Sequence, residues 1–422
     1  MPTFTLECFQ NEFLPVGASE VNAVLTVTAA AAEGDEARAA PGGAAEVIII
    51  DTSGSMGGAK LRQAKQATSA AIDCIRDGAQ FAVIAGDHAA HVIYPASPGL
   101  TEANADTRFE ADRAVRALEA AGGTAIGAWL QCATELLAGV AGINHAILLT
   151  DGKDEHEQPA DLERAISAAT GVFQCDCRGV GVDWTVAELR KVATGLLGSV
   201  DIVADPAGLT ADFTAVIEAA MGKQVAEVNL RLWSPHGSQI SFLKQVAPEV
   251  SDLTPTRVSV NPLTGDYATG AWGAESRDYH LAIRVNPGAV GDEMLAGRVT
   301  LIVDGQPSGQ GLVKAIWTDD TARSTKINRQ VAHYTGQAEL ADAIQAGLEA
   351  RKSGDIDTAT AKLGRAVQLA AAAGNTETAE LLAKVVDVQD PATGRVKLKA
   401  AVAEADEMTL DTRSTKTKRI GR

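Results

Sequence analysis

Two hydrophobic periodicities alternate along residues 46–221. Short continuous apolar runs, such as 47–50 and 146–149, are typical of strands that are buried on both faces. Stretches with apolar residues three and four positions apart separate these runs and predict helices, at residues 58–76, 106–120, 126–137, 159–169, 186–193 and 209–221. Strands separated by helices predict a Rossmann-like α/β domain over 46–221, with a doubly wound and mostly parallel sheet.

Strand-like alternation returns on both sides of this domain. Residues 3–10 and 21–30 are rich in β-formers, and after residue 223 helix-length patterns are absent up to about residue 325. We therefore predict an antiparallel β-sandwich domain over 223–325. The N-terminal strands in 1–30 have no other partner of their own kind, so we expect them to join that sandwich, with the α/β domain inserted between. Residues 30–45, small and polar with glycine and proline, are expected to form a loop.

Helical spacing dominates again after residue 331. Three amphipathic stretches at 338–351, 356–373 and 376–388 predict a C-terminal helical region over 331–405 that docks onto the β-domain. Residues 406–422 are basic, rich in threonine and poor in apolar side chains, so they are predicted to form a disordered tail.

Charge and composition exclude several kinds of partner. The formal net charge of −17 disfavours nucleic acid and anionic membrane surfaces. No segment approaches the roughly 18 apolar residues of a membrane span, and no secretory signal is visible. The five scattered cysteines are expected to be free thiols, which favours a reducing cytoplasm.

Oxygen-bearing side chains gather where the predicted parallel strands end. Asp51, Ser53 and Ser55 follow one buried strand at alternate positions, and Asp151 follows another. Thr124 comes from a third segment, within Gly-Gly-Thr. In an open α/β sheet, ligands bind outside the carboxyl ends of the strands. Five oxygen ligands without a soft ligand suit Mg²⁺, or alternatively Mn²⁺ or Ca²⁺, and disfavour zinc.

The segment 46–221 resembles a von Willebrand factor type A (VWA) domain with an intact metal-ion-dependent adhesion site (MIDAS). The resemblance rests on Asp-Thr-Ser-Gly-Ser at 51–55, on Thr124 and on Asp151 within Thr-Asp-Gly, all in the family's order. It implies a binding module without catalytic residues, in which an acidic group of a protein partner or a water completes the metal shell. The wider layout resembles bacterial intracellular proteins in which this domain splits a β-sandwich.

Three functions follow from this interpretation. The leading one is a metal-dependent interaction module or scaffold in Ser/Thr kinase or stress-response signalling. The alternative is a subunit that acts in trans with an AAA+ ATPase or a chelatase-like machine, since residues 54–60 lack the glycine and hydroxyl residue that a phosphate loop needs beside its lysine. A hydrolase is disfavoured because no histidine is expected near the ligand loops. The acidic residues at 151–157 form either a solvated loop or a rim that tunes partner choice.

The basic tail carries a second possible function. Thr409, Thr412, Thr415 and Thr417 lie among arginines and lysines, as sites of basophilic kinases do. Phosphorylation there would create a handle for an arginine-lined pocket. Residues 417–420 also suit forkhead-associated domains, which resemble one another in binding phosphothreonine with an aliphatic residue at the third position after it.

Overall fold

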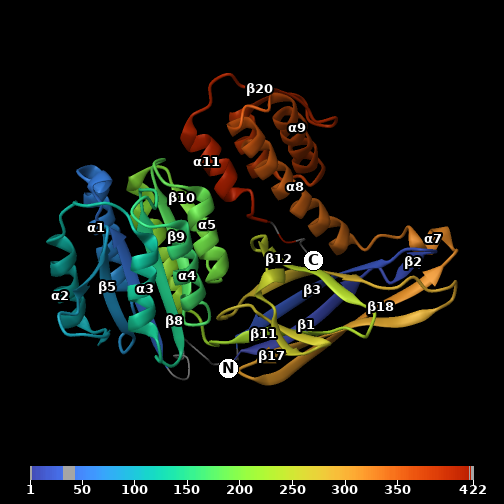
Figure 1. The fold of residues 1–422 in the computed structure, drawn as a ribbon, viewed down its shortest axis with the longest axis horizontal. Helices are drawn as coiled ribbons and strands as arrows, with labels where there is room; N and C mark the ends of the chain where they lie inside the picture. The colour runs from blue at the N-terminus through green and yellow to red at the C-terminus, as the bar shows by residue number, and fades with distance from the viewer. Residues whose placement is uncertain (1, 32–42, 418, 420–422) are drawn as a thin grey trace. The chain divides into compact units, whose positions relative to one another are not determined.

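The computed structural model describes residues 2–31, 43–417 and 419 (Figure 1). The chain divides into two compact units, one spanning Gly34–Ala226 and the other combining Met1–Glu33 with Glu227–Arg422. Most of the predicted loop at 30–45 lies outside the described residues, as do residues 418 and 420–422 of the predicted tail.

The α/β unit is built on a seven-stranded mixed sheet in the order β10-β9-β8-β4-β5-β6, with β7 also paired to β5. All neighbours from β10 to β5 are parallel, while β6 and β7 run antiparallel to β5. The prediction of a mostly parallel sheet with intervening helices is confirmed. The strands are β4 (Ala44–Asp51), β5 (Gln80–Gly86), β6 (Ala90–Tyr94), β7 (Thr101–Glu102), β8 (Ile143–Thr150), β9 (Gln174–Val180) and β10 (Val200–Val203); the helices are α1 (Ala59–Cys74), α2 (Ala105–Arg116), α3 (Ile126–Leu137), α4 (Pro159–Ala169), α5 (Val186–Gly195) and α6 (Leu209–Met221).

Strand β4 lies near the middle of this sheet and is buried along its whole length. Ile48 and Ile50 belong to an aliphatic core that also contains apolar side chains of α1 and α6. Strand β8 pairs with β4 in parallel, so the two strands end at the same edge of the sheet. This pairing places Asp51, the last residue of β4, beside Asp151, the residue that follows β8.

The second unit contains two large sheets, and their strands come from the segments before and after the α/β unit in the sequence (Figure 1). In the five-stranded sheet, β3 pairs antiparallel with both β1 and β16, which lies about 250 residues further along the sequence. Strand β18 of the six-stranded sheet packs against β1 and β3. The first sheet contains β1 (Thr3–Gln10), β3 (Glu20–Ala30), β16 (Ser276–Arg284), β12 (Gln239–Ala247) and β13 (Ser251–Asp252); the second contains β14 (Val258–Asn261), β15 (Thr264–Ala268), β11 (Val228–Trp233), β17 (Glu293–Val303), β18 (Gln306–Thr318) and β2 (Phe13–Pro15).

One pairing departs from the predicted antiparallel arrangement. Strand β2 is parallel to β18, with Phe13 opposite Ile316. Strands β1 and β3 belong to one sheet and β2 to the other, so the chain crosses between sheets twice within a few residues. A crossing strand does not have to reverse against its sequence neighbour, which is why hairpin reasoning does not apply to it.

Helices follow the β-strands, after the short α7 (Thr321–Ser324). Helices α8 (Arg329–Lys352), α9 (Ile356–Ala372) and α10 (Thr376–Val385) agree with the predicted helical stretches apart from their ends. Val331 and Tyr334 of α8 pack with Val24 of β3 and with Val246 and Ala247 of β12, so the helices dock on the sheet.

The prediction of a helical region over 331–405, with its last helix at 376–388, is wrong after residue 385. Strands β19 (Val386–Asp390) and β20 (Arg395–Leu398) form an antiparallel hairpin there. Its turn contains Gly394 in the left-handed conformation, packed so closely on Gly364 of α9 that a Cβ at 364 would lie 2.3 Å from the Gly394 carbonyl oxygen. Two glycines that permit a close backbone contact, together with the buried Val386 and Val396, favour the hairpin over a longer helix.

The prediction that residues 406–422 form a disordered tail is also wrong for the described part. Helix α11 (Glu404–Arg413) buries Leu410 completely in the core of the helical region. The segment that follows contacts the five-stranded sheet, where Val250 N donates to the Thr415 carbonyl oxygen at 2.7 Å. Polar partners thus order a segment that has too few apolar residues to fold by burial alone.

Candidate metal site

Backbone hydrogen bonds hold two loops together at the carboxyl edge of the α/β sheet. Ala121 N donates to the Thr52 carbonyl oxygen at 2.7 Å, and Gly54 N donates to that of Gly122 at 3.0 Å. The Thr52 amide in turn donates to the carbonyl oxygen of Gly86, at the end of β5. Backbone hydrogen bonds alone therefore hold the segment after β4 against the segment before α3.

Asp51 is fully buried, and each of its carboxylate oxygens accepts a hydrogen bond. Its Oδ1 accepts from Ser53 N at 2.7 Å, and its Oδ2 accepts from the Thr150 hydroxyl at 2.5 Å. Burial raises the pKa of Asp51, and the bonds from Ser53 and Thr150 oppose that rise. Thr150 orients the carboxylate, a role that its position inside a buried strand did not reveal.

The five predicted ligand residues converge. The Ser53 and Ser55 hydroxyl oxygens lie 3.0 Å apart, and Ser55 Oγ donates to Asp151 Oδ1 at 2.7 Å. Thr124 approaches the same point, because a Cβ on Gly152 would lie 2.8 Å from Thr124 Oγ1 and 3.6 Å from Ser55 Oγ. The absence of a side chain at Gly152 keeps the space between these oxygens open.

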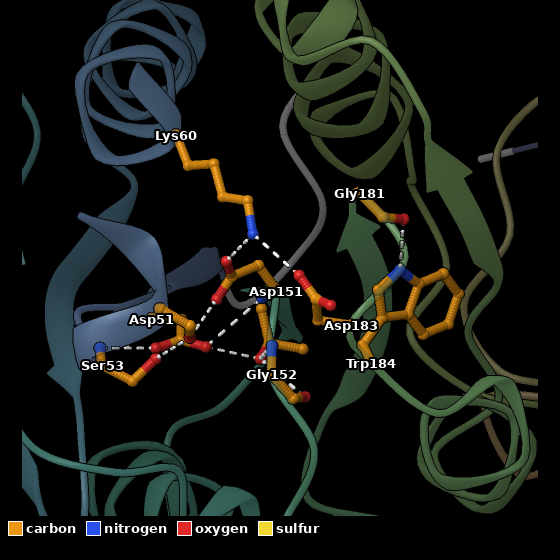
Figure 2. Close-up of polar contacts among 10 residues, drawn as sticks. Asp51, Ser53, Lys60, Asp151, Gly152, Gly181, Asp183 and Trp184 are labelled. Carbon is orange, nitrogen blue, oxygen red and sulfur yellow. Dashed lines mark hydrogen bonds and ion pairs between the residues drawn. The ribbon is translucent and has the colours of Figure 1, made fainter. Parts of the chain in front are cut away.

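Lys60, on the first turn of α1, is a cation already placed in this cluster (Figure 2). Its ammonium group contacts Asp151 Oδ2 and lies 3.2 Å from Asp183 Oδ2. Partial burial disfavours the charged amine, but Asp151 and Asp183 outweigh it and raise the pKa of Lys60. Lys60 and Asp183 were both missed, although Asp183 lies just beyond β9, where the strand-end rule also points.

The donor chemistry fits a small hard cation. Two carboxylates and three hydroxyls meet at one point, and the Lys60 ammonium stands where a cation would neutralise Asp151. Within the described parts of the chain, no group of three or more His, Cys, Asp or Glu side chains is arranged as a metal site. A cation here would therefore rely on hydroxyl oxygens as much as on carboxylates.

The acidic loop that follows Asp151 is not simply solvated. Asp154 Oδ1 accepts from Ile126 N at 3.2 Å, and Glu157 accepts from Gly127 N at 2.6 Å and Ala128 N at 3.2 Å. Both acids thus cap the N-terminus of α3, where unpaired amides and the helix dipole favour negative charge. Burial first, and then Glu157, raise the pKa of Asp154 to about 8.

The expectation that no histidine lies near the ligand loops is wrong. His156 Nδ1 accepts from Thr124 N at 3.2 Å, and His156 N donates to the Thr124 carbonyl oxygen at 3.1 Å. The sequence places His156 only five residues after Asp151, and this proximity was the signal that was overlooked. These bonds fasten the acidic loop to the segment that carries Thr124.

The four predicted phosphorylation sites belong to the other unit and have engaged hydroxyls. Thr412 and Thr415 are buried, and Thr415 Oγ1 donates to Glu249 at 2.7 Å. Thr409 and Thr417 are partly buried, and each donates to a backbone carbonyl at 2.5 Å. Thr412 and Thr415 therefore do not lie on an open tail in this structure, and phosphorylation of the four threonines stays a prediction.

Comparisons with known proteins identify the class that this fold and site define. The family model for the von Willebrand factor type A domain matches residues 45–202, and that for the von Willebrand factor type A C-terminal domain matches residues 368–414. The structure of a von Willebrand factor type A protein from Catenulispora acidiphila is 52% identical, with a TM-score of 0.94 over 99% of this chain and 98% of that one. The chain therefore belongs to the von Willebrand factor type A family.

More distant relatives show a similarity of fold only. The ArnB paralog VWA2 from Sulfolobus acidocaldarius aligns over 98% of both chains with a TM-score of 0.60 and 14% identity. An uncharacterized protein from Synechocystis is 28% identical over 218 residues, and the match spans about half the length of that relative. In the described part of the chain, no helix is both long and apolar enough to cross a membrane.

Proposed function

We propose that this protein is an interaction module that binds an acidic group of a protein partner through a divalent cation. The observation that carries the proposal is the convergence of five oxygen-bearing side chains at the carboxyl edge of the sheet, in a chain of the von Willebrand factor type A family. The residues that would hold the cation are Asp51, Ser53, Ser55, Thr124 and Asp151.

The preference for Mg²⁺, with Mn²⁺ or Ca²⁺ as alternatives, follows from the all-oxygen donor set. When bound, the cation would supply a positive charge that attracts a partner carboxylate, and that carboxylate would complete the metal's coordination shell. Thr150 and the Ser53 amide orient Asp51, while backbone bonds to Gly122 hold the serine loop against the segment that carries Thr124. A site positioned in this way requires little rearrangement when a partner docks.

We further propose that the site binds without catalysing a reaction. His156 lies beside the site, but its Nδ1 accepts a hydrogen bond from the Thr124 amide and is not available there as a base. Both oxygens of Asp51 have internal donors. The free cysteines among the described residues support a reducing compartment for this activity.

Isothermal titration calorimetry with Mg²⁺ tests the proposed site. Asp51→Ala should weaken Mg²⁺ binding by more than about 100-fold, because even the outer partners of a metal ligand are worth about 10- to 100-fold. Glu155→Ala is the matched control: it removes an exposed acid from the loop that follows Asp151, lies outside the five predicted ligands, and should bind Mg²⁺ much as the unmodified protein does. Equal binding by the unmodified protein and Asp51→Ala would refute the assignment.

Partner capture tests the second half of the proposal. Proteins retained on the immobilised chain in Mg²⁺ should be released by EDTA and should not be retained by Asp51→Ala. Partners that remain bound after both changes would show that the interaction surface lies elsewhere on the molecule.

A further inference from the structure

A polar pocket of about 390 Å³ lies on the five-stranded sheet of the second unit. Side chains of β1, β3 and β16 line it together with Gln330 and Tyr334 of α8. Arg419, from the segment after α11, also lines it. The volume falls in the range of pockets that hold a small ligand or a large side chain.

Asp278 of β16 is the anchor of this pocket and is only 3% exposed at its side chain. Thr26 Oγ1 donates to its Oδ1 at 2.6 Å, and Tyr334 OH donates to its Oδ2 at 2.5 Å. Arg419 binds the same carboxylate through two nitrogens, with Nε at 2.7 Å from Oδ2 and Nη2 at 3.1 Å from Oδ1. Two parallel bonds of this kind match a guanidinium better than an ammonium.

Other acceptors around the pocket extend this preference for a donor-rich ligand. Gln330 Oε1 is buried and has no hydrogen-bond partner in the described structure. Glu7 of β1 also lines the pocket and adds an acidic residue to its wall. A guanidinium has five N–H donors and no acceptor, so it is the side chain that this set of oxygens suits. Burial, followed by the hydrogen bond and charge of Asp278, raises the pKa of Tyr334, so the phenol stays a donor at neutral pH.

The backbone that leads to Arg419 is held as an extended segment. Thr415 and Thr417 exchange backbone bonds with residues 248–250, and Lys416 forms an antiparallel bridge with Glu249. Thr417 Oγ1 also donates to the Val246 carbonyl oxygen at 2.5 Å. The tail is thus bound as a short added strand that places an arginine in the pocket two positions after a bonded threonine, a mode in which backbone bonds supply affinity and the side-chain pocket supplies specificity.

We propose that this pocket is a receptor site for an arginine-bearing extended peptide, and that Arg419 of the same chain is its resident, exchangeable ligand. The ligand class is a basic segment with a hydroxyl residue two positions before an arginine. An exchangeable tail keeps the Asp278 carboxylate paired until a competing peptide arrives. The apparent affinity for that peptide is then set by the difference in binding free energy between the peptide and the tail.

Peptide binding to the full-length chain tests the proposal. The probe is a fluorescent peptide with the sequence of residues 413–422, followed by fluorescence anisotropy. Arg419→Ala removes the guanidinium that competes for Asp278 and should bind the probe about 10- to 100-fold more tightly than the unmodified protein, because charged hydrogen bonds are worth about 1.5–3 kcal/mol. Lys416→Ala, which changes a basic tail residue outside the pocket, should behave much more like the unmodified protein.

Two controls distinguish recognition of the guanidinium from non-specific binding of the peptide. A probe with citrulline at position 419 keeps the shape but loses the charge and should bind Arg419→Ala at least about tenfold more weakly. Adding Tyr334→Phe to Arg419→Ala removes one donor to Asp278 with little loss of packing and should weaken the probe without unfolding the chain. Equal binding of the citrulline probe, or no gain on Arg419→Ala, would overturn the proposal.

Discussion

A buried histidine between two carboxylates makes the α/β unit sensitive to a single substitution. His145 of β8 is 7% exposed; its Nδ1 lies 2.9 Å from Glu46 of β4, and its Nε2 lies 2.9 Å from Asp176 of β9. Burial lowers the pKa of His145, but Glu46 and Asp176 outweigh it and raise the pKa to about 10. His145 is therefore an imidazolium at neutral pH and compensates the charge of Glu46, which is fully buried.

His145→Leu removes that charge and leaves Glu46 unpaired. The difference between a pKa of about 10 and the ordinary 6.5 corresponds to about 5 kcal/mol of stabilisation. Burial raises the pKa of Glu46, which offsets part of this amount. A net loss of about 3–5 kcal/mol is expected, as for breaking other buried ion pairs, and this is a large share of the 5–15 kcal/mol typical of a folded domain.

Hydrogen–deuterium exchange assigns the loss to the correct unit, since a chain with two units need not unfold in one step. Peptides from β4 and β8 should lose protection in His145→Leu and keep it in His91→Leu, the control at a histidine that is 60% exposed in the same unit. Adding Glu46→Gln to His145→Leu should recover part of the loss, because the unpaired charge is then removed as well.

The stabilisation also has a defined pH dependence. The folded state holds the His145 proton more tightly than the unfolded state, so the stabilisation is complete below about pH 6.5 and fades as the pH rises toward 10. Urea unfolding should show a large gap between the unmodified protein and His145→Leu at about pH 6 and a smaller gap at about pH 9.5. A loss below about 1 kcal/mol, or a gap that does not change with pH, would refute the charge assignment.

Two further predictions follow from named contacts. Lys60→Met removes the ammonium that competes for the metal site and should tighten Mg²⁺ binding about tenfold by calorimetry, whereas Arg62→Met on the same helix should not; equal effects would point to net charge alone. In helix α8, Gly347→Ala places a Cβ 2.7 Å from Leu363 Cγ and should lower stability by about 1–3 kcal/mol. Gly336→Ala meets nothing within 4 Å and should raise stability by about 0.5–1 kcal/mol, so thermal unfolding that shifts the same way for both would contradict the packing argument.

The sequence predicted the α/β unit well because its strands and helices carry strong periodicities. Helices α3, α4 and α6 begin and end where the apolar spacing predicted. Strand β18 shows little alternation because Gly309 and Gly311 take the place of larger side chains; at these positions a Cβ would come within 3.2–3.3 Å of Leu6 and Cys8 on β1. The alternation of apolar and polar side chains cannot indicate a strand at positions where close packing requires glycine.

The tail was mispredicted for a related reason. Composition measures how much apolar surface a segment can bury, and residues 414–419 have almost none. Thr415 and Arg419 are held instead by specific partners, Glu249 and Asp278, which lie more than 140 positions away in the sequence. Such distant polar contacts leave no local signal in the chain.

Some residues of the candidate metal site can be predicted from a single sequence, and others cannot. Ser53 and Ser55 follow the end of a strand directly, so the backbone carries them to the sheet edge and their spacing alone locates them. Lys60 reaches Asp151 through a long, flexible side chain, whose direction depends on the charges that surround its end and not on its place in the motif. Charge compensation at a binding site is therefore visible only in the folded structure. The difference in Mg²⁺ affinity between Lys60→Met and Arg62→Met measures how much Lys60 contributes to it.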